Sequence, residues 1–233
     1  MPDQTSQVLE LLHEDYPPYI YISDGKVVGS EAALVTEILG RAGFQVKWRM
    51  TNYRRLVREI QLSTKPLCAP GYNQSHQESY GVAASRPFAW FAGTALAIRK
   101  TDLDLFSKHT SISDVMSDQQ LRGAFLMGAR YQGVAEDVRA GKVDRHILIA
   151  STDVELGLLV ARGRVHFALI NPDQTNYLIE NNKLAANLMA FQPTEMAGPR
   201  HVGFICSKAS MGKILDRINA SIEPLGLYKP MPK

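Results

Sequence analysis

Cysteine is scarce in this chain of 233 residues, which contains only Cys68 and Cys206 and no CxxC pair. The missing pair excludes a zinc ribbon and a thioredoxin-like redox motif. The six histidines show no HxH, HxxxH or HExxH spacing, and the GxSxG, GxGxxG and Walker A patterns are also missing. Because no standard catalytic signature is present, we expect no catalytic residues, no bound metal and no cofactor.

Long apolar runs and clusters of one charge are also missing. No run approaches eighteen apolar residues, so the sequence predicts no membrane span. Lys and Arg exceed Asp and Glu by only 26 to 23 and form no basic run, which argues against nucleic-acid binding. An apolar share of 45% and a charged share of 21% are typical of a globular protein rather than a disordered chain or a coiled coil.

The N-terminal residues do not resemble an export signal. They read MPDQTSQ, with neither a basic start nor an apolar stretch. Two interpretations stay open on composition alone: a cytoplasmic protein, or an exported one whose leader has been removed.

Strand-like apolar runs alternate with amphipathic segments in two series. This alternation is typical of an α/β fold with mostly parallel sheets. We expect two lobes, the first formed by residues 1–98 and 200–233 and the second by residues 101–190. The chain then crosses between the lobes twice, near 98–101 and near 190–199.

Local signals support this organisation. Asp24-Gly25 predicts a small hairpin, because this dipeptide suits a tight turn between strands. A helix is expected from Ser30 or Glu31, with apolar residues at helical spacing and a stop near Gly43. Asn52 is a suitable cap for the next helix.

Four segments, in order, resemble the family 3 solute-binding proteins of bacterial uptake systems. They are YPPYIYISDGKVVGSEAALVTEILGRAG near the start, SRPFAWFAGTALAIRK, SISDVMSDQQLRGAFLMGARYQG, and ARGRVHFALINPDQTNYLI. The resemblance covers nearly the whole chain and rests on the ordered set rather than on one motif. It implies a two-lobed α/β fold of the periplasmic-binding-protein type (type II), with two mostly parallel sheets and two crossing strands.

The resemblance also implies a function. A small polar ligand would bind in the cleft between the lobes, which close on it by hinge bending. The receptor would be a periplasmic or extracellular monomer with its signal peptide removed, and would serve the membrane permease of an ABC transporter. Carried over position by position, the resemblance places these residues at ligand-contact positions: Tyr16, Tyr53, Pro70, Gly71, Asn73, Ala129, Arg130 and Tyr131.

The sequence departs from the family at both positions that recognise an amino acid. Glu78 stands where the family has an Arg for the α-carboxylate, and Asn171 stands where it has an Asp for the α-ammonium. Neither side chain can replace a bidentate Arg contact, and Glu78 would repel a carboxylate. We therefore expect a ligand other than a standard L-amino acid, and an amine or cation if Glu78 faces the cleft.

Several residues keep two interpretations. Arg55, or its neighbour Arg54, either supplies a new anion contact or belongs to the wet face of a helix, while Tyr53 and Tyr72 either stack on the ligand or simply pack. Cys68 and Cys206 both fall in strands of the first lobe. They are either buried free thiols or, in an exported protein, a feasible disulfide.

Two other functions fit the same scaffold. One is an enzyme that resembles the cyclohexadienyl dehydratases, with Glu78 as its proton-transfer group. The other is the extracellular sensor domain of a longer signalling protein. Turnover of prephenate or arogenate would identify the enzyme, and the length of the parent gene would identify the sensor.

Overall fold

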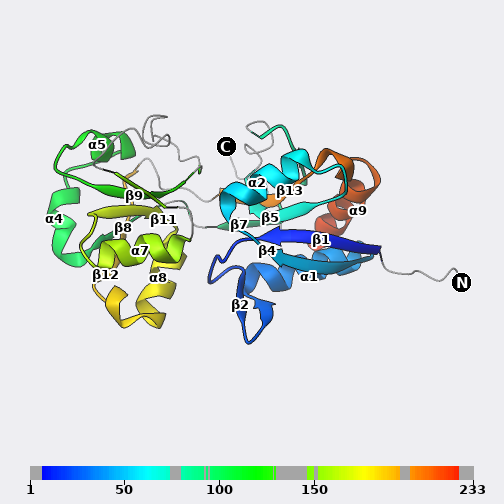
Figure 1. Cartoon of the computed structure of the whole chain (residues 1–233), viewed down its shortest axis with the longest axis horizontal. Coiled ribbons are helices and arrows are strands. Elements are labelled where there is room, and N and C mark those ends of the chain that lie inside the picture. The colour runs from blue at the N-terminus through cyan, green and yellow to red at the C-terminus, as the bar shows by residue number, and fades with distance from the viewer. Residues whose placement is uncertain are drawn as a thin grey trace, which may run out of the picture. The chain divides into compact units, whose positions relative to one another are not determined.

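The computed structural model describes residues 7–73, 80–91, 93, 95–127, 129, 146–149, 152–194 and 200–225. The chain divides into two compact units (Figure 1). The first unit contains residues 1–15, 19–91 and 200–233, and the second contains residues 16–18 and 92–199. No helix in the described part of the chain is long and apolar enough to cross a membrane.

A mixed sheet forms the centre of the first unit, with strand order β4-β1-β5-β13-β6 and with β7 also paired to β13. The first three strands are parallel, whereas β13 is antiparallel to β5, β6 and β7. The strands are β1 (Gln7–His13), β4 (Phe44–Met50), β5 (Cys68–Tyr72), β6 (Ala83–Ala84), β7 (Ala89–Phe91) and β13 (Arg200–Cys206). The β2 (Tyr21–Ser23) and β3 (Lys26–Val28) strands form a separate hairpin.

The helices of the first unit are α1 (Ser30–Arg41), α2 (Tyr53–Leu62) and α9 (Lys213–Ile222), with short 3₁₀ turns at Lys208–Ser210 and Glu223–Leu225. Two of them, α1 and α2, begin where the sequence predicts. The Asn52 side chain accepts a hydrogen bond from the Arg55 N–H and caps α2, as predicted. The predicted hairpin turn is confirmed, and Asp24 and Gly25 both adopt positive φ there.

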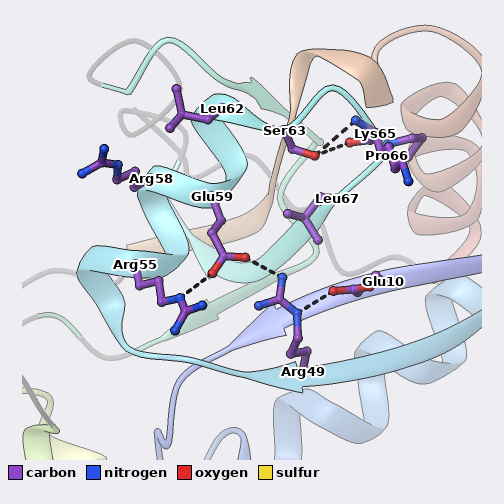
Figure 2. Close-up of a pocket in the computed structure, with 10 residues that line it drawn as sticks. All are labelled: Glu10, Arg49, Arg55, Arg58, Glu59, Leu62, Ser63, Lys65, Pro66 and Leu67. Carbon is purple, nitrogen blue, oxygen red and sulfur yellow. Dashed lines mark hydrogen bonds and ion pairs between the residues drawn. The ribbon is translucent and has the colours of Figure 1, made fainter.

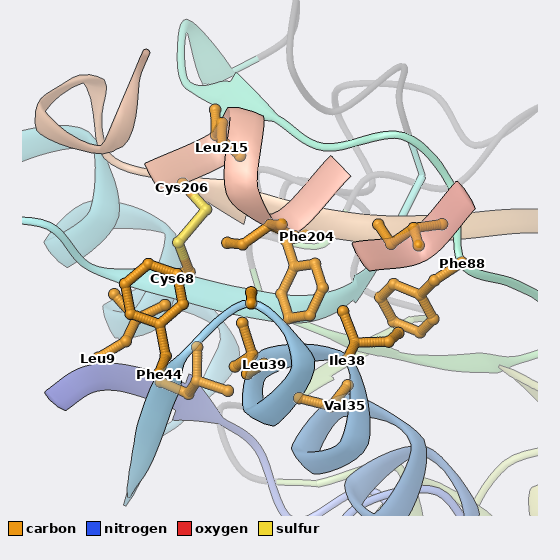
Figure 3. Close-up of a cluster of buried hydrophobic side chains, with 14 of the residues drawn as sticks. Leu9, Val35, Ile38, Leu39, Phe44, Cys68, Phe88, Phe204, Cys206 and Leu215 are labelled. Atoms are coloured by element: carbon orange, nitrogen blue, oxygen red, sulfur yellow. A yellow bond between two sulfur atoms is a disulfide. The ribbon is translucent and has the colours of Figure 1, made fainter. Parts of the chain in front are cut away.

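Apolar side chains cover both faces of the first sheet. On one face, helices α1 and α9 pack over the sheet (Figure 3). The side chains in this cluster include Val35, Ile38, Leu39 and Leu215 of the helices and Leu9, Phe44, Phe88 and Phe204. On the other face Leu56 and Ile60 of α2 pack against Leu12, Tyr72 and Tyr80. This burial fixes the position of both helix N-termini relative to the ends of β1 and β5.

A disulfide joins Cys68 of β5 to Cys206 of β13, inside the core (Figure 3). The two residues are partners in the antiparallel pairing of these strands, and both are fully buried. Because β13 follows the second unit in the chain, the bridge connects two segments that are 138 residues apart in sequence.

The second unit contains another mixed sheet, with strand order β10-β9-β11-β8-β12. Its strands are β8 (Ala95–Arg99), β9 (Gly123–Leu126), β10 (Ile147–Ile149), β11 (Phe167–Ile170) and β12 (Leu188–Phe191). Its helices are α4 (Leu103–Phe106), α5 (Ile112–Ser117), α7 (Asp153–Ala161) and α8 (Pro172–Asn181), with short 3₁₀ turns at Lys100–Asp102 and Lys183–Ala185. Phe106, Phe125 and Phe167 form the aromatic part of its core.

The strand β8 belongs to the second unit. It pairs with β11 on one side and with β12 on the other, and it lies within 92–199, the long segment of that unit. The boundary expected from the sequence, at residue 98, falls inside this strand. The difference arises because an apolar strand that follows a chain crossing can pair with either sheet, and periodicity does not distinguish the two.

Candidate functional site

Three predicted contact residues lie at or beside the C-terminal end of β5 in the first unit. Pro70 and Gly71 belong to the strand, and Asn73 follows it. Pro70 is buried, whereas Gly71 and Asn73 are partly exposed. Gly71 has φ +84°, a backbone conformation that residues with a side chain rarely adopt. The end of β5 is therefore irregular, and its pairing with β13 shifts register there; we call residues 70–73 the β5 turn, or Gly71 turn.

Tyrosine hydroxyls and a carboxylate lie on the α2 side of this turn. The Tyr72 hydroxyl donates a hydrogen bond of 3.2 Å to Oε2 of Glu14, just after β1. The predicted contact residue Tyr53, at the start of α2, stacks on Tyr72 with ring centroids 6.3 Å apart, and its hydroxyl hydrogen-bonds the Tyr80 hydroxyl. Burial, the Glu14 charge and the two other tyrosines raise the pKa of Tyr72 well above its ordinary value, so it remains a neutral donor.

A second carboxyl group lies against the same turn. Glu31, in the first turn of α1, is 2% exposed, and its two oxygens lie 3.0 and 3.1 Å from the position that a Cβ on Gly71 would occupy. Its Oε1 has no hydrogen-bond partner among the described residues. Burial raises the pKa of Glu31 to about 8, although the Arg200 charge opposes this effect. The group is therefore mostly uncharged at neutral pH.

The surroundings of Glu31 are held by the backbone and by aromatic rings. The carbonyl of Tyr19 accepts hydrogen bonds from the N–H groups of Glu31 and Ala32, at 3.0 and 3.2 Å. The Tyr19 ring stacks on Phe91 with centroids 4.2 Å apart, and Phe91 pairs with Arg200 across β7 and β13. The Nε of Arg200 is also buried and has no partner among the described residues.

Arg55 lies in a different environment from the β5 turn. Its side chain is 71% exposed and pairs with Glu59 one helical turn later, with 2.8 Å between Nε and Oε1. It lines an open surface hollow of about 700 Å³, together with Arg49, Arg58 and Lys65 (Figure 2). Arg49 contacts Glu10 and Glu59 in this hollow, each at 2.5 Å. Hydrogen bonds to Glu59 and Glu10 raise the pKa of Arg49, so its guanidinium stays charged.

Five predicted contact residues fall in the second unit, and the structure describes three of them, Tyr16, Ala129 and Asn171. Asn171 is 3% exposed and caps α8, where its side chain accepts a hydrogen bond of 2.9 Å from the Asp173 N–H. Gln174 completes this capping box and also donates to Asp153 at the start of α7, at 3.3 Å. Ala129 is 6% exposed, and Tyr16 is partly buried. Glu78, Arg130 and Tyr131 lie outside the described residues.

The structure brings together acidic groups that the sequence did not identify as site residues. Glu14 and Glu31 reach the end of β5 from opposite faces of the sheet, through Tyr72 and Gly71 respectively. Glu31 was recognised only as a helix start, since an acidic residue in a first turn is common at the surface. The place of Glu31 between Gly71 and the apolar face of α1 is a property of the fold, and the sequence gives no signal for it. Among the described residues, no group of three His, Cys, Asp or Glu side chains is placed to hold a metal ion.

These features define a class of protein, a two-lobed α/β binding protein of the periplasmic type. The chain belongs to the bacterial extracellular solute-binding proteins of family 3, whose model matches residues 11–223. No curated protein matches the chain.

Solved structures share the fold at low sequence identity. The arginine-, lysine-, histidine-binding protein ArtJ from Geobacillus stearothermophilus aligns with a TM-score of 0.73 and 15% identity, over 94% of this chain and 89% of that one. A histidine kinase sensor domain aligns with a TM-score of 0.71 and 18% identity, over 96% and 91% of the two chains. An ancestral amino acid-binding protein, a precursor of cyclohexadienyl dehydratase, aligns with a TM-score of 0.67 and 15% identity, over 94% of this chain and 89% of that one. At these identities the likeness establishes the fold.

Proposed function

We propose that the chain is a non-catalytic receptor for a small polar ligand with a cationic group, and that this ligand is not a standard L-amino acid. The observation that carries the proposal is the acidic, tyrosine-rich end of β5. Glu14 and Glu31 supply carboxyl groups there, and Tyr53 and Tyr72 supply aromatic faces, which attract cations. The carboxyl of Glu78, in place of the family's Arg, adds to this preference.

The mechanism that we propose is closure of two lobes around the ligand. The first lobe would contribute the β5 turn with Tyr53, and the second would contribute Tyr16, Ala129, Arg130, Tyr131 and Asn171. A ligand that contacts both lobes binds the closed form more tightly and shifts the population toward it. A membrane permease would then recognise the closed monomer. The buried disulfide supports an oxidising location such as the periplasm or the cell exterior.

A thermal-shift screen tests this function. The panel would contain choline, agmatine, putrescine, the twenty amino acids, succinate and glucose. A ligand at about a hundred times its Kd adds about 2.7 kcal/mol to the free energy of unfolding, which is readily detected. We expect the cations to stabilise the protein and succinate and glucose to leave it unchanged. Stabilisation only by anions, by sugars or by any of the twenty amino acids would contradict the proposal.

A pair of variants locates the binding. Glu14→Gln keeps the size of the side chain and removes its charge, so we expect it to weaken binding of the cation by about tenfold or more. Glu37→Gln is the matched control, since Glu37 lies on α1, is half exposed and pairs only with Arg41 among the described residues. Equal affinities for the two variants would place the cation elsewhere.

Two other functions each have one observation in their favour. The likeness to a histidine kinase sensor domain favours a sensory role, which a longer parent gene with a kinase region would establish. The likeness to the dehydratase precursor favours an enzyme, which release of product from prephenate or arogenate would establish. We favour the receptor because the described residues at the β5 turn offer carboxyl groups and hydroxyls for binding, and the sequence has no catalytic signature.

A further inference from the structure

We propose that Glu31 is a proton-linked positioning residue, which holds the Gly71 turn as an uncharged acid and releases its proton when a cation binds beside that turn. This inference rests on the proposed function, because it takes the β5 turn as the ligand-contact segment. It adds a chemical event, the release of a proton to solvent, and it predicts a dependence of affinity on pH.

The geometry of Glu31 supports this role. Both oxygens touch the site of the missing Gly71 side chain, so the carboxyl fills the space under the turn. A side chain 2% exposed with a buried oxygen that lacks a partner among the described residues is expensive to ionise. An opposite charge within about 4–6 Å reverses this preference and favours the carboxylate. A cation at the end of β5 would bring such a charge.

The groups around Glu31 determine the sign of the effect. Arg200 on β13 already favours the carboxylate, but burial outweighs it and leaves the pKa of Glu31 at about 8. Gly71 on β5 carries no charge, and on the other face Tyr72 stays neutral beside Glu14. Burial lowers the pKa of His13, at the end of β1, so His13 is uncharged above pH 6.5. Between pH 6.5 and 8, Glu31 is therefore the group that must lose a proton.

The proton balance of the step is simple. In the free protein Glu31 is a carboxylic acid, and in the complex it is a carboxylate that faces the cation. One O–H bond breaks and the proton goes to bulk water, with no other reactant. At pH 7 formation of the complex should release close to one proton. The affinity should increase by up to tenfold for each unit by which pH is raised toward 8.

Isothermal titration calorimetry with choline and agmatine, in two buffers of different ionisation enthalpy, measures this release directly. Choline carries a quaternary ammonium that cannot lose a proton, so any proton released on its binding comes from the protein. Agmatine also carries a primary amine, so its proton release is judged by the difference between the wild type and Glu31→Gln. We expect proton release and a rising affinity in the wild type and in Glu37→Gln. Glu31→Gln, which is nearly isosteric with the uncharged acid, should bind with neither effect.

Two outcomes would overturn the inference alone. Binding of a cation without proton release in the wild type would do so, and so would a pH dependence that survives in Glu31→Gln. Both would leave the proposed function intact. If neither probe binds at any pH, while the wider thermal-shift panel finds no ligand, the proposed function fails and the inference fails with it. Should Glu31→Gln not fold, a carboxyl-carbon NMR titration of the wild type with and without choline replaces it, and an unchanged Glu31 pKa overturns the inference.

Discussion

The two units are both α/β folds around a mixed sheet, but they differ in chain continuity and in the residues that stabilise their cores. The first unit is built from three separate segments of chain and contains both cysteines, a buried acid and a network of charged side chains around Arg49. The second is nearly continuous, has no cysteine, and packs Phe106, Phe125 and Phe167 edge to face. The last strand of the first unit, β13, comes after the long segment of the second unit in the chain, and the disulfide links it covalently to β5.

The largest expected effects come from removing one large core ring in each unit. Phe204→Ala in the first unit and Phe167→Ala in the second each delete a fully buried ring and should cost about 3–5 kcal/mol. Hydrogen exchange should show lost protection only in the unit that carries the change. The matched variants Phe204→Leu and Phe167→Leu should cost less. Loss of protection across both units in each alanine variant would mean that they unfold together.

Removal of the disulfide should affect only the first unit. The double variant Cys68→Ala/Cys206→Ala releases the constraint on the unfolded chain and should cost about 2–5 kcal/mol. Hydrogen exchange of β5 and β13 should increase, while β9 and β11 keep their protection. The unmodified protein with a reducing agent is a useful control, because a fully buried bridge should resist reduction until the first unit opens. Equal destabilisation of both units would show that the bridge also supports the second.

Glu31 should give the first unit a distinctive dependence of stability on pH. Its pKa is about 8 in the folded protein and near 4.5 in the unfolded chain, so between these values the folded state holds the extra proton. Its contribution to the free energy of unfolding therefore falls as pH rises, by at most about 1.4 kcal/mol per pH unit. This contribution is measured as the difference in the free energy of unfolding between the wild type and Glu31→Gln, determined by urea unfolding at a series of pH values from 4.5 to 8. Glu37→Gln should match the wild type, and a constant difference across this range would contradict the assignment.

The smallest effects come from helix caps. Asn52→Ala in the first unit and Ser111→Ala in the second each remove a side-chain oxygen that accepts a backbone N–H, and should cost about 1 kcal/mol. Ser111 belongs to a capping box, in which the bonds from Ser111 and Thr110 hold the pKa of Asp114 low. Urea unfolding of the two variants measures both costs. A serine at position 52, which can still cap, should restore most of the loss.

Much of the fold follows from local pattern. The hairpin at Asp24-Gly25 and the cap at Asn52 were predictable because each depends on a few neighbouring residues. The membership of β8 was not, because pairing with β11 and β12 is a choice between distant partners. The antiparallel half of each sheet has the same origin, since strand direction depends on how the chain crosses between units.

The ligand contacts expected from family resemblance at Tyr53 and Gly71 stay predictions. The structure shows their surroundings: Tyr53 stacks on Tyr72, which donates to Glu14, and Gly71 lies against Glu31. Glu31 and Glu14 were not identified, because their importance comes from burial and from contacts across the sheet rather than from spacing. Arg55 illustrates the converse, since a plausible cation on a helix lies in an exposed ion pair with Glu59.

The Cys68–Cys206 bridge also changes how force travels through the molecule. It closes a covalent ring that contains every residue from 68 to 206, including residues 92–199 of the second unit. Tension applied between the two ends of the chain passes from β5 directly into β13, so the backbone of residues 92–199 carries no load while the bridge is intact. Pulling on the two ends of the chain would therefore stretch only the residues outside the ring.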